Sequence, residues 1–129
     1  MIDCEAEVRK MLAGSSVLAG IIGARIYMSR DFPKNFELND GPALKASVRG
    51  GSPDYTRKVL SPSIQIQSYG RTDKEARSLD KAVFDCLDNK KFGYFVMLAH
   101  LESLSQLSVE PETHWPFMLA FYTFTLRNP

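Results

Sequence analysis

The chain lacks several features that would place it in a functional class at once. Its 129 residues carry 16 lysines and arginines against 15 acids, so the formal net charge is only +1. Proteins dedicated to binding nucleic acid usually have a strong basic excess, and this balance disfavours that class. Two cysteines, Cys4 and Cys86, are too few for the disulfide framework of a small secreted protein.

Long apolar runs are also missing. None reaches the ~18 residues of a transmembrane helix, and the acidic start (Asp3, Glu5, Glu7) is the reverse of a signal peptide. We therefore expect no membrane contact, synthesis in a reducing cytosol, and Cys86 as a reduced core thiol. A chain of this length can bury a core without metal or disulfides, and we expect a single domain spanning residues 1–129.

Patterns that carry chemistry are equally sparse. The two histidines, His100 and His114, are too few for a closed zinc site, even with Glu102 close to His100. Ser15 is not in a strand-to-helix nucleophile elbow, and Gly50-Gly51 lacks the lysine and helix start of a phosphate-binding loop. The sequence therefore predicts no catalytic, metal-binding or cofactor-binding residues, and we expect a protein that is not an enzyme.

The clearest positive signal is a strand followed by a capped helix. Ser63–Tyr69 alternates apolar and polar residues, as a half-buried strand does, and Gly70 ends it. Thr72 and Glu75 have the spacing of a capping box, in which the hydroxyl accepts from the Glu75 amide and the carboxylate reaches back to the Thr72 amide. Apolar residues then recur at helical spacing at positions 76, 79, 83, 86 and 87.

The other expected elements follow from similar patterns. We predict a helix over Asp3–Ala13 and, after the apolar run Val17–Ile22, a short strand at Arg25–Tyr27. An ordered surface loop over Ser29–Pro42 then leads to a strand over Ala43–Val48, and a loop or two-stranded arm follows over Gly51–Pro62. The strands Phe92–Leu104 and Trp115–Leu126 form an antiparallel hairpin that turns near Glu110–His114. The order α-β-β-β-α-β-β predicts an α+β fold, in which two helices pack on a mostly antiparallel sheet of four to five strands.

The last predicted strand is apolar on both faces. Trp115, Phe117, Leu119 and Phe121 point one way, and the even-numbered residues from Met118 to Leu126 point the other way. An antiparallel sheet with one face in water normally alternates apolar and polar residues. Either this strand is central to the core, or one of its faces is buried against another subunit.

Two charged segments have opposite sign. The segment 49–58 contains Arg49, Arg57 and Lys58, whereas residues 102–112 contain acids and no lysine or arginine. Both are consistent with solvated loops. They are also consistent with a basic arm that meets an acidic edge on the next copy in a ring, or with an arm that lines a pore for DNA. The candidate interface or pore residues are Arg49, Tyr55, Arg57, Lys58, Glu110 and Glu112.

Ile22–Tyr27 after an amino-terminal helix, and Ile64–Gly70 before a helix with Glu75-Ala76 and Leu79-Asp80, resemble the tail terminator (tail completion) proteins of long-tailed bacteriophages. The closing hairpin and its polar end, Arg127–Pro129, fit as well. The chain departs from the family pattern where Tyr27 is followed by Met28, because a proline usually comes soon after this tyrosine and here the first is Pro33.

The resemblance implies a structural virion protein without catalytic residues or cofactors. Family members form a ring, commonly a hexamer, that caps the tail tube, ends its polymerisation and offers a docking surface to the head. The implied partners are further copies of the chain, the tail tube protein, the head–tail connector protein, and DNA that passes through the pore without sequence-specific binding. The implied place is the head–tail junction of the virion, after assembly in the host cytoplasm.

Three other functions stay open from the sequence. Another head–tail connector or neck protein could have a similar small fold. A small enzyme or ligand-binding domain would have a pocket between helices and sheet. A regulatory module that binds nucleic acid is disfavoured by the net charge of +1.

Overall fold

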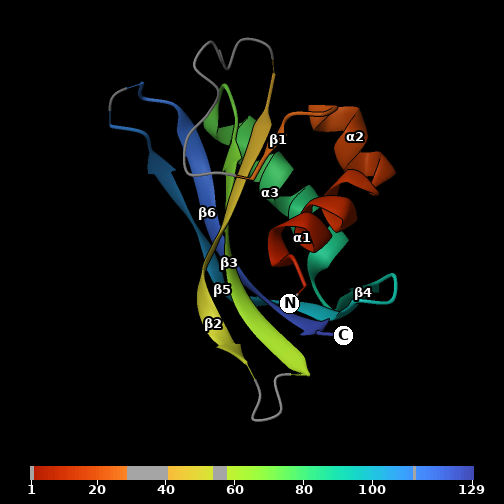
Figure 1. Cartoon of the computed structure of the whole chain (residues 1–129). Coiled ribbons are helices and arrows are strands. Elements are labelled where there is room, and N and C mark those ends of the chain that lie inside the picture. The colour runs from red at the N-terminus through yellow and green to blue at the C-terminus, as the bar shows by residue number, and fades with distance from the viewer. Residues whose placement is uncertain (1, 29–40, 54–57, 112) are drawn as a thin grey trace.

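The computed structural model describes residues 2–28, 41–53, 58–111 and 113–129 (Figure 1). Its helices are α1 (Cys4–Ala13), α2 (Ser16–Ile22) and α3 (Asp73–Leu87), and its strands are β1 (Ile26–Tyr27), β2 (Ala43–Pro53), β3 (Val59–Tyr69), β4 (Lys90–Phe92), β5 (Val96–Val109) and β6 (Pro116–Arg127). The class α+β is therefore as expected.

The strands form one mixed sheet in the order β1-β2-β3-β6-β5-β4. Only the pair β1 and β2 is parallel, and the other four pairs are antiparallel. The expected order of two helices and four to five strands is wrong in two places. The apolar run Val17–Ile22 lies in a helix, α2, and the polar stretch after α3 contains the short strand β4.

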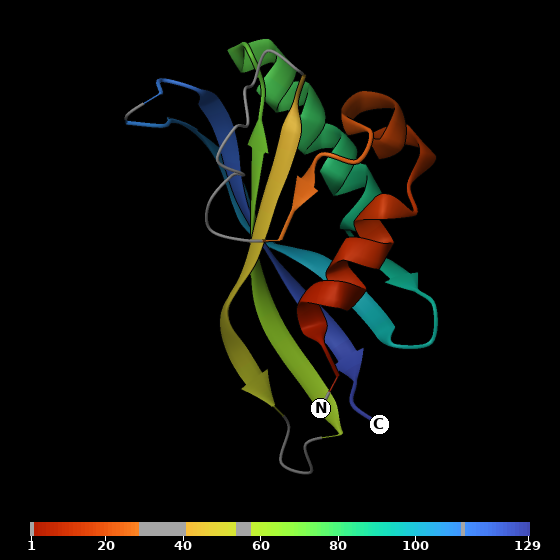
Figure 2. The same cartoon turned by 45° about the horizontal axis from the view of Figure 1, so that its top comes forward.

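All three helices lie on one face of a strongly curled sheet (Figure 2). Between the helices and the sheet lies the main core, which includes Leu12, Leu18, Ile22, Leu44, Ile64, Ile66, Leu79, Leu87, Tyr122, Phe124 and Leu126, all without exposed surface. The opposite face is covered by no described helix, and we call it the open face.

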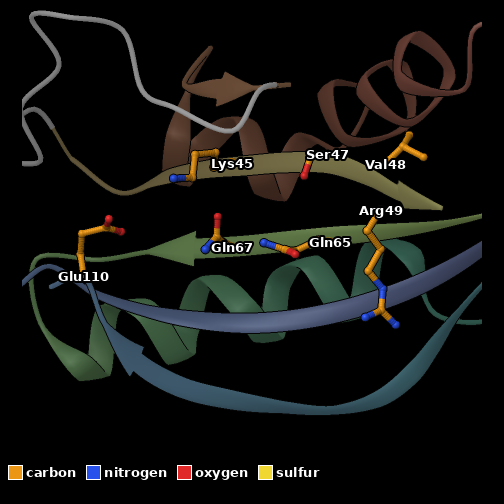
Figure 3. Close-up of a pocket in the computed structure, with 7 residues that line it drawn as sticks. All are labelled: Lys45, Ser47, Val48, Arg49, Gln65, Gln67 and Glu110. Atoms are coloured by element: carbon orange, nitrogen blue, oxygen red, sulfur yellow. The ribbon is translucent and has the colours of Figure 1, made fainter.

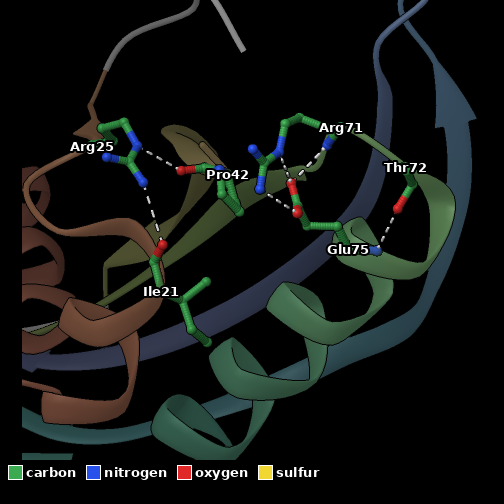
Figure 4. A network of polar contacts seen from close by, with 6 residues as sticks. All are labelled: Ile21, Arg25, Pro42, Arg71, Thr72 and Glu75. Atoms are coloured by element: carbon green, nitrogen blue, oxygen red, sulfur yellow. Dashed lines mark hydrogen bonds and ion pairs between the residues drawn. The ribbon is translucent and has the colours of Figure 1, made fainter. Parts of the chain in front are cut away.

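Helix α3 begins as the capping pattern predicts, with one change of partner (Figure 4). The Glu75 amide donates to the Thr72 hydroxyl over 3.2 Å. The Glu75 carboxylate does not reach the Thr72 amide; it accepts from the Arg71 amide at 2.9 Å and pairs with the Arg71 guanidinium at 3.0 Å. Gly70 is required just before this turn, because a Cβ there would lie 2.3 Å from the Ala76 nitrogen.

Side-chain caps also place α1 and α2. Asp3 accepts from the Ala6 amide at 3.1 Å, as the predicted helix start requires. Ser15 accepts from the Leu18 amide at 3.3 Å, so this serine is the N-cap of α2. Arg25 then joins the end of α2 to the start of β2 by donating to the Ile21 and Pro42 carbonyls (Figure 4).

The expected arm between the second and third strands is a continuation of β2 and β3. The two strands stay paired from Ala43–Tyr69 down to Pro53–Leu60, with a bulge between Val48 and Gly50. Residues 54–57 of the predicted arm and most of the predicted surface loop (29–40) lie outside the described residues.

Strand β6 alternates as the sequence predicts. Ala120, Tyr122, Phe124 and Leu126 are buried beneath the helices. Phe117, Leu119 and Phe121 lie on the open face, where Phe117 and Leu119 form a second small cluster with Tyr69 and Trp115. The strand is central to the core, between β3 and β5, and its second apolar face is only partly covered.

Candidate functional site

The open face contains a shallow polar groove of about 430 Å³ (Figure 3). Its lining comes from β2, β3 and the residue that follows β5, and consists of Lys45, Ser47, Val48, Arg49, Gln65, Gln67 and Glu110. Neighbouring strands present their polar residues to this face by the period-two alternation of the sheet. Two of the predicted interface residues line this groove: Arg49, from β2, and Glu110, which follows β5. They lie at opposite ends of it (Figure 3).

Arg49 crosses the open face to reach an acid of its own chain. Its guanidinium pairs with the Glu102 carboxylate at 3.0 Å and lies 3.7 Å above the centre of the Phe121 ring. It also donates to the Ser63 hydroxyl at 3.0 Å. Glu102 accepts a second bond from the Thr123 hydroxyl. The hydrogen bond from Thr123 has the largest effect on the pKa of the Glu102 carboxyl. Together with the contacts of Arg49, it holds this pKa below its usual range.

Glu110 is likewise bound inside the protomer. Its carboxylate accepts from the phenol of Tyr69 at 2.7 Å. Tyr69 is completely buried, its ring stacks on Phe117 with centroids 4.9 Å apart, and Lys45 lies 5.2 Å from the ring centre. Burial, the bond to Glu110 and the charge of Glu110 all raise the pKa of Tyr69, so this phenol stays protonated at neutral pH.

The remaining predicted interface residues are not brought into this groove. Lys58 is exposed at the far end of the sheet, beside a shallow depression that Tyr94, Met97 and Arg127 help to line. Arg127 donates to the Tyr94 carbonyl at 3.0 Å. Tyr55, Arg57 and Glu112 lie outside the described residues.

Several polar groups were missed as groove residues although a signal for them exists. Lys45, Gln65 and Gln67 alternate with buried apolar residues, which places them together on the face away from the core. The bond between Tyr69 and Glu110 joins positions 41 residues apart, and nothing in the local sequence signals it.

The groups considered for chemistry have ordinary surroundings. Within the described residues, no three of the possible ligands His, Cys, Asp and Glu come together as a metal site. His100 lies opposite Thr123 in the β5–β6 pairing, and its Nδ1 has no described hydrogen-bond partner. Burial raises the pKa of the half-buried Cys86 thiol, which donates to the Met11 carbonyl over 3.8 Å. In the described part of the chain, no helix is long and apolar enough to cross a membrane.

Among the described residues, five of the eight exposed large apolar side chains lie on β5. Leu104, Leu107 and Val109 of β5 have 85%, 37% and 50% of their surface exposed. They lie on the part of the β5–β6 hairpin that projects from the body of the molecule (Figures 1 and 2). Exposed apolar side chains mark a candidate site of protein association where they form a patch.

Comparisons with known proteins define the fold. No protein-family model and no curated protein matches the sequence. A chain in the solved structure titled "Virion of native gene transfer agent (GTA) particle" matches with a TM-score of 0.68 and 13% sequence identity. The match covers 97% of this chain and 95% of that chain. The two chains therefore have the same fold over nearly their whole lengths.

Proposed function

We propose that this chain is a structural protein of a phage-like virion, and specifically the tail terminator. The observation that carries the proposal is the match in fold, over 97% of the chain, to a component of a gene transfer agent virion. The resemblance of Ile64–Gly70 and the following helix to tail terminators supports the narrower role.

In this role the chain acts through its shape. Copies assemble into a homo-oligomeric ring, a hexamer in the narrow form of the proposal, that caps the tail tube. The closed ring leaves no free end to which a further tube subunit can add. Its other face offers the head–tail connector a docking surface, and its centre lets DNA pass without reading its sequence. No catalytic step, metal or cofactor belongs to this function.

The decisive experiment is to image tails assembled without this protein by negative-stain electron microscopy. We expect tubes that vary in length and end without a cap, and that fail to join filled heads. Adding the purified protein should restore a cap and joining. Tubes of normal, capped length in its absence would refute the terminator role.

A second candidate, another connector or neck protein of the same virion, is favoured equally by the match in fold. The two differ in what the isolated protein binds first. A terminator binds purified tails before any head is present, whereas a connector protein binds filled heads. Pull-down of each purified particle with the tagged protein separates them.

The sequence also suggests how copies could meet, through a basic arm (Arg49, Tyr55, Arg57, Lys58) against Glu110 and Glu112 of the next copy. A contact of this type weakens with salt, because ions screen exposed charges. Ring assembly on tails should then fall with rising salt, and replacing Arg57 and Lys58 by glutamate should abolish it. Assembly that is unchanged by both would remove the arm from the interface.

A further inference from the structure

We propose that the outer edge of β5, residues 103–108, pairs as an added strand with the outer edge of β2, residues 47–52, in a second copy of the chain. This proposal rests on the proposed ring and names the contact between its subunits. It differs from the charge contact suggested by the sequence, because backbone hydrogen bonds and apolar side chains would carry it.

The first half of the contact is the unprotected edge of β5. Strand β4 pairs with β5 only between Val96 and Ala99, and the Asp88 carboxylate accepts from the Leu101 amide at 2.9 Å just beyond. In the described part of the chain, no strand pairs with the outer side of residues 103–109. Soluble proteins usually protect such an edge with charges or proline, but the sequence Ser-Leu-Ser-Gln-Leu-Ser-Val has neither.

The second half is the edge of β2 at the opposite side of the sheet. Strand β1 pairs with β2 only at Leu44 and Lys45. Among the described residues, none pairs with the outer side of residues 47–53. Residues 47–52 of β2 and residues 103–108 of β5 are therefore both without a described strand partner on their outer side.

The directions of the two strands suit pairing between copies in the same orientation. Strands β2 and β6 both run antiparallel to β3, and β5 runs antiparallel to β6. Strand β5 is therefore antiparallel to β2, and a neighbour placed side by side would continue the sheet with an antiparallel ladder. Such head-to-tail contacts use two different surfaces of one chain, as a ring requires.

Side chains on the two edges also match when the helices of both copies lie on the same side. Leu107 lies opposite Met118 in β6, on the helix side of the sheet by alternation, and Val48 of β2 packs against the core on that side. Ser108 and Ser47 then lie together on the open face. Pairing Ser108 with Ser47 places Leu107 beside Val48, which covers part of the exposed apolar surface.

This alignment displaces the neighbour along the strands. Within one subunit, Ser108 of β5 is opposite Phe117 of β6, Phe117 is opposite Tyr69 of β3, and Tyr69 is opposite Ala43 of β2. Val109 and its partner Pro116 lie one residue further along. Val109 is thus level with about position 42, whereas the proposed alignment places it beside position 46, one residue past the paired stretch. The shift is about four residues, or about 13 Å at ~3.3 Å per residue. Such a contact closes into a ring only if the strands are inclined to the ring axis; otherwise it propagates as a helical filament.

The test is disulfide trapping in a background in which Cys4 and Cys86 are replaced by alanine. The chain would carry Ser47→Cys with Ser108→Cys, because directly opposed residues of an antiparallel pair have Cα atoms close enough for a disulfide. A second chain with Ser47→Cys and Gln106→Cys covers an alignment shifted by two residues. Each is mixed with purified tails, oxidised and run on a denaturing gel without reductant.

We expect a ladder of cross-linked species that stops at one size, with the tail capped. Lys58→Cys with Glu110→Cys, in the same background, is the control for the charge contact and should give no ladder. Ser108→Cys alone should give no dimer, because a dimer would mean that β5 pairs with itself about a twofold axis. Capped tails with no ladder from either β2–β5 pair would overturn the edge contact while leaving the terminator role intact.

The ring can also be refuted while the edge contact stands. A ladder that continues without a limit, on tails that stay uncapped, would keep the edge contact and refute the ring.

A pair of substitutions that needs no added cysteine tests the same contact independently. Leu104→Lys with Val109→Lys should lose the assembled species, since both side chains are exposed and the fold does not depend on them. Val17→Lys, at a 63% exposed position on α2, is the matched control and should assemble normally.

Discussion

The bond between Tyr69 and Glu110 is the sharpest test of the open face, because one atom can be removed from it. Tyr69→Phe deletes the hydroxyl that donates to the Glu110 carboxylate at 2.7 Å. The ring keeps its place on Phe117, at 4.9 Å between centroids, and its edge contact with Trp115 at 6.5 Å. Any loss of stability therefore reports the hydrogen bond and not the packing.

The expected magnitude follows from the kind of bond. A hydrogen bond to a charged group contributes about 1.5–3 kcal/mol. Glu110 is partly exposed, so water can replace the phenol, and the loss should lie near the lower value, about 1.5 kcal/mol. An unfolding entropy of ~2.1 cal/mol/K per residue gives about 0.27 kcal/mol/K for 129 residues. The melting temperature should then fall by about 5–6 °C.

The assay is differential scanning calorimetry at neutral pH, with urea unfolding as a check. Tyr94→Phe is the matched control: Tyr94 is 71% exposed, and its change should stay within about 0.5 kcal/mol. Glu110→Gln and the double variant complete a mutant cycle, and the effects should be clearly non-additive because the two groups share one bond. A Tyr69→Phe melting temperature equal to that of Tyr94→Phe, or a cycle without coupling, would refute the bond.

Three further changes test the local structure around α3. Gly70→Ala should cost about 2–3 kcal/mol by overpacking against the first turn of α3, where the new Cβ would meet backbone atoms; Gly20→Ala, which meets nothing within 4 Å, is its control in urea unfolding and should not destabilise. Thr72→Ala removes the N-cap of α3 and should cost about 1 kcal/mol in the same assay, with Thr72→Ser restoring most of it. Burial raises the pKa of the Asp80 carboxyl more than its bond from Ser105 lowers it, so ionisation destabilises the folded state above the unfolded pKa. Asp80→Asn should therefore raise the melting temperature at pH 7, and the gain should shrink as the pH falls below about 4, where the carboxyl is protonated in both states.

The sequence predicts best where a local pattern and a local cap agree. Helix α3 was predicted with its N-cap Thr72, and the alternation of β3 and β6 correctly separates buried from open faces. These features depend on neighbours within a few residues. The same reasoning explains why the class α+β was right although the element order was incomplete.

The misses have physical reasons. Val17–Ile22 is a short apolar run, and periodicity alone does not distinguish a buried strand from a buried helix at that length. Ser15 at its start and Gly23 at its end are helix-cap residues, and together they mark α2. Strand β4 has only three residues, and its turn depends on Asn89 and Gly93, both with positive φ, which no apolar pattern reveals.

The candidate interface residues were the least predictable, because charges were paired by sign and not by position. Arg49 and Glu102 are 53 residues apart, and they meet because the order β2-β3-β6-β5 places their strands in one sheet. Their relative position depends on the register of these four strands, including the bulge after Val48. A list of charged residues contains none of this information.

The positions of the charges bear directly on how copies would meet. On the open face, Arg49 and Glu110 each have a partner in their own subunit, so a contact through them between copies would first have to break those bonds. The β5 edge requires no such exchange. In the described part of the chain no strand pairs with its outer side, and Leu104 and Val109 are exposed in the isolated chain. Burying apolar surface lowers the free energy in proportion to its area. Assembly through the edge should therefore persist at high salt, which screens exposed charges but strengthens apolar burial if the salt is a sulfate. Ring formation on tails that survives in ammonium sulfate but fails with Leu104→Lys and Val109→Lys would favour the edge over the arm, and loss of assembly on adding sodium chloride would favour the arm.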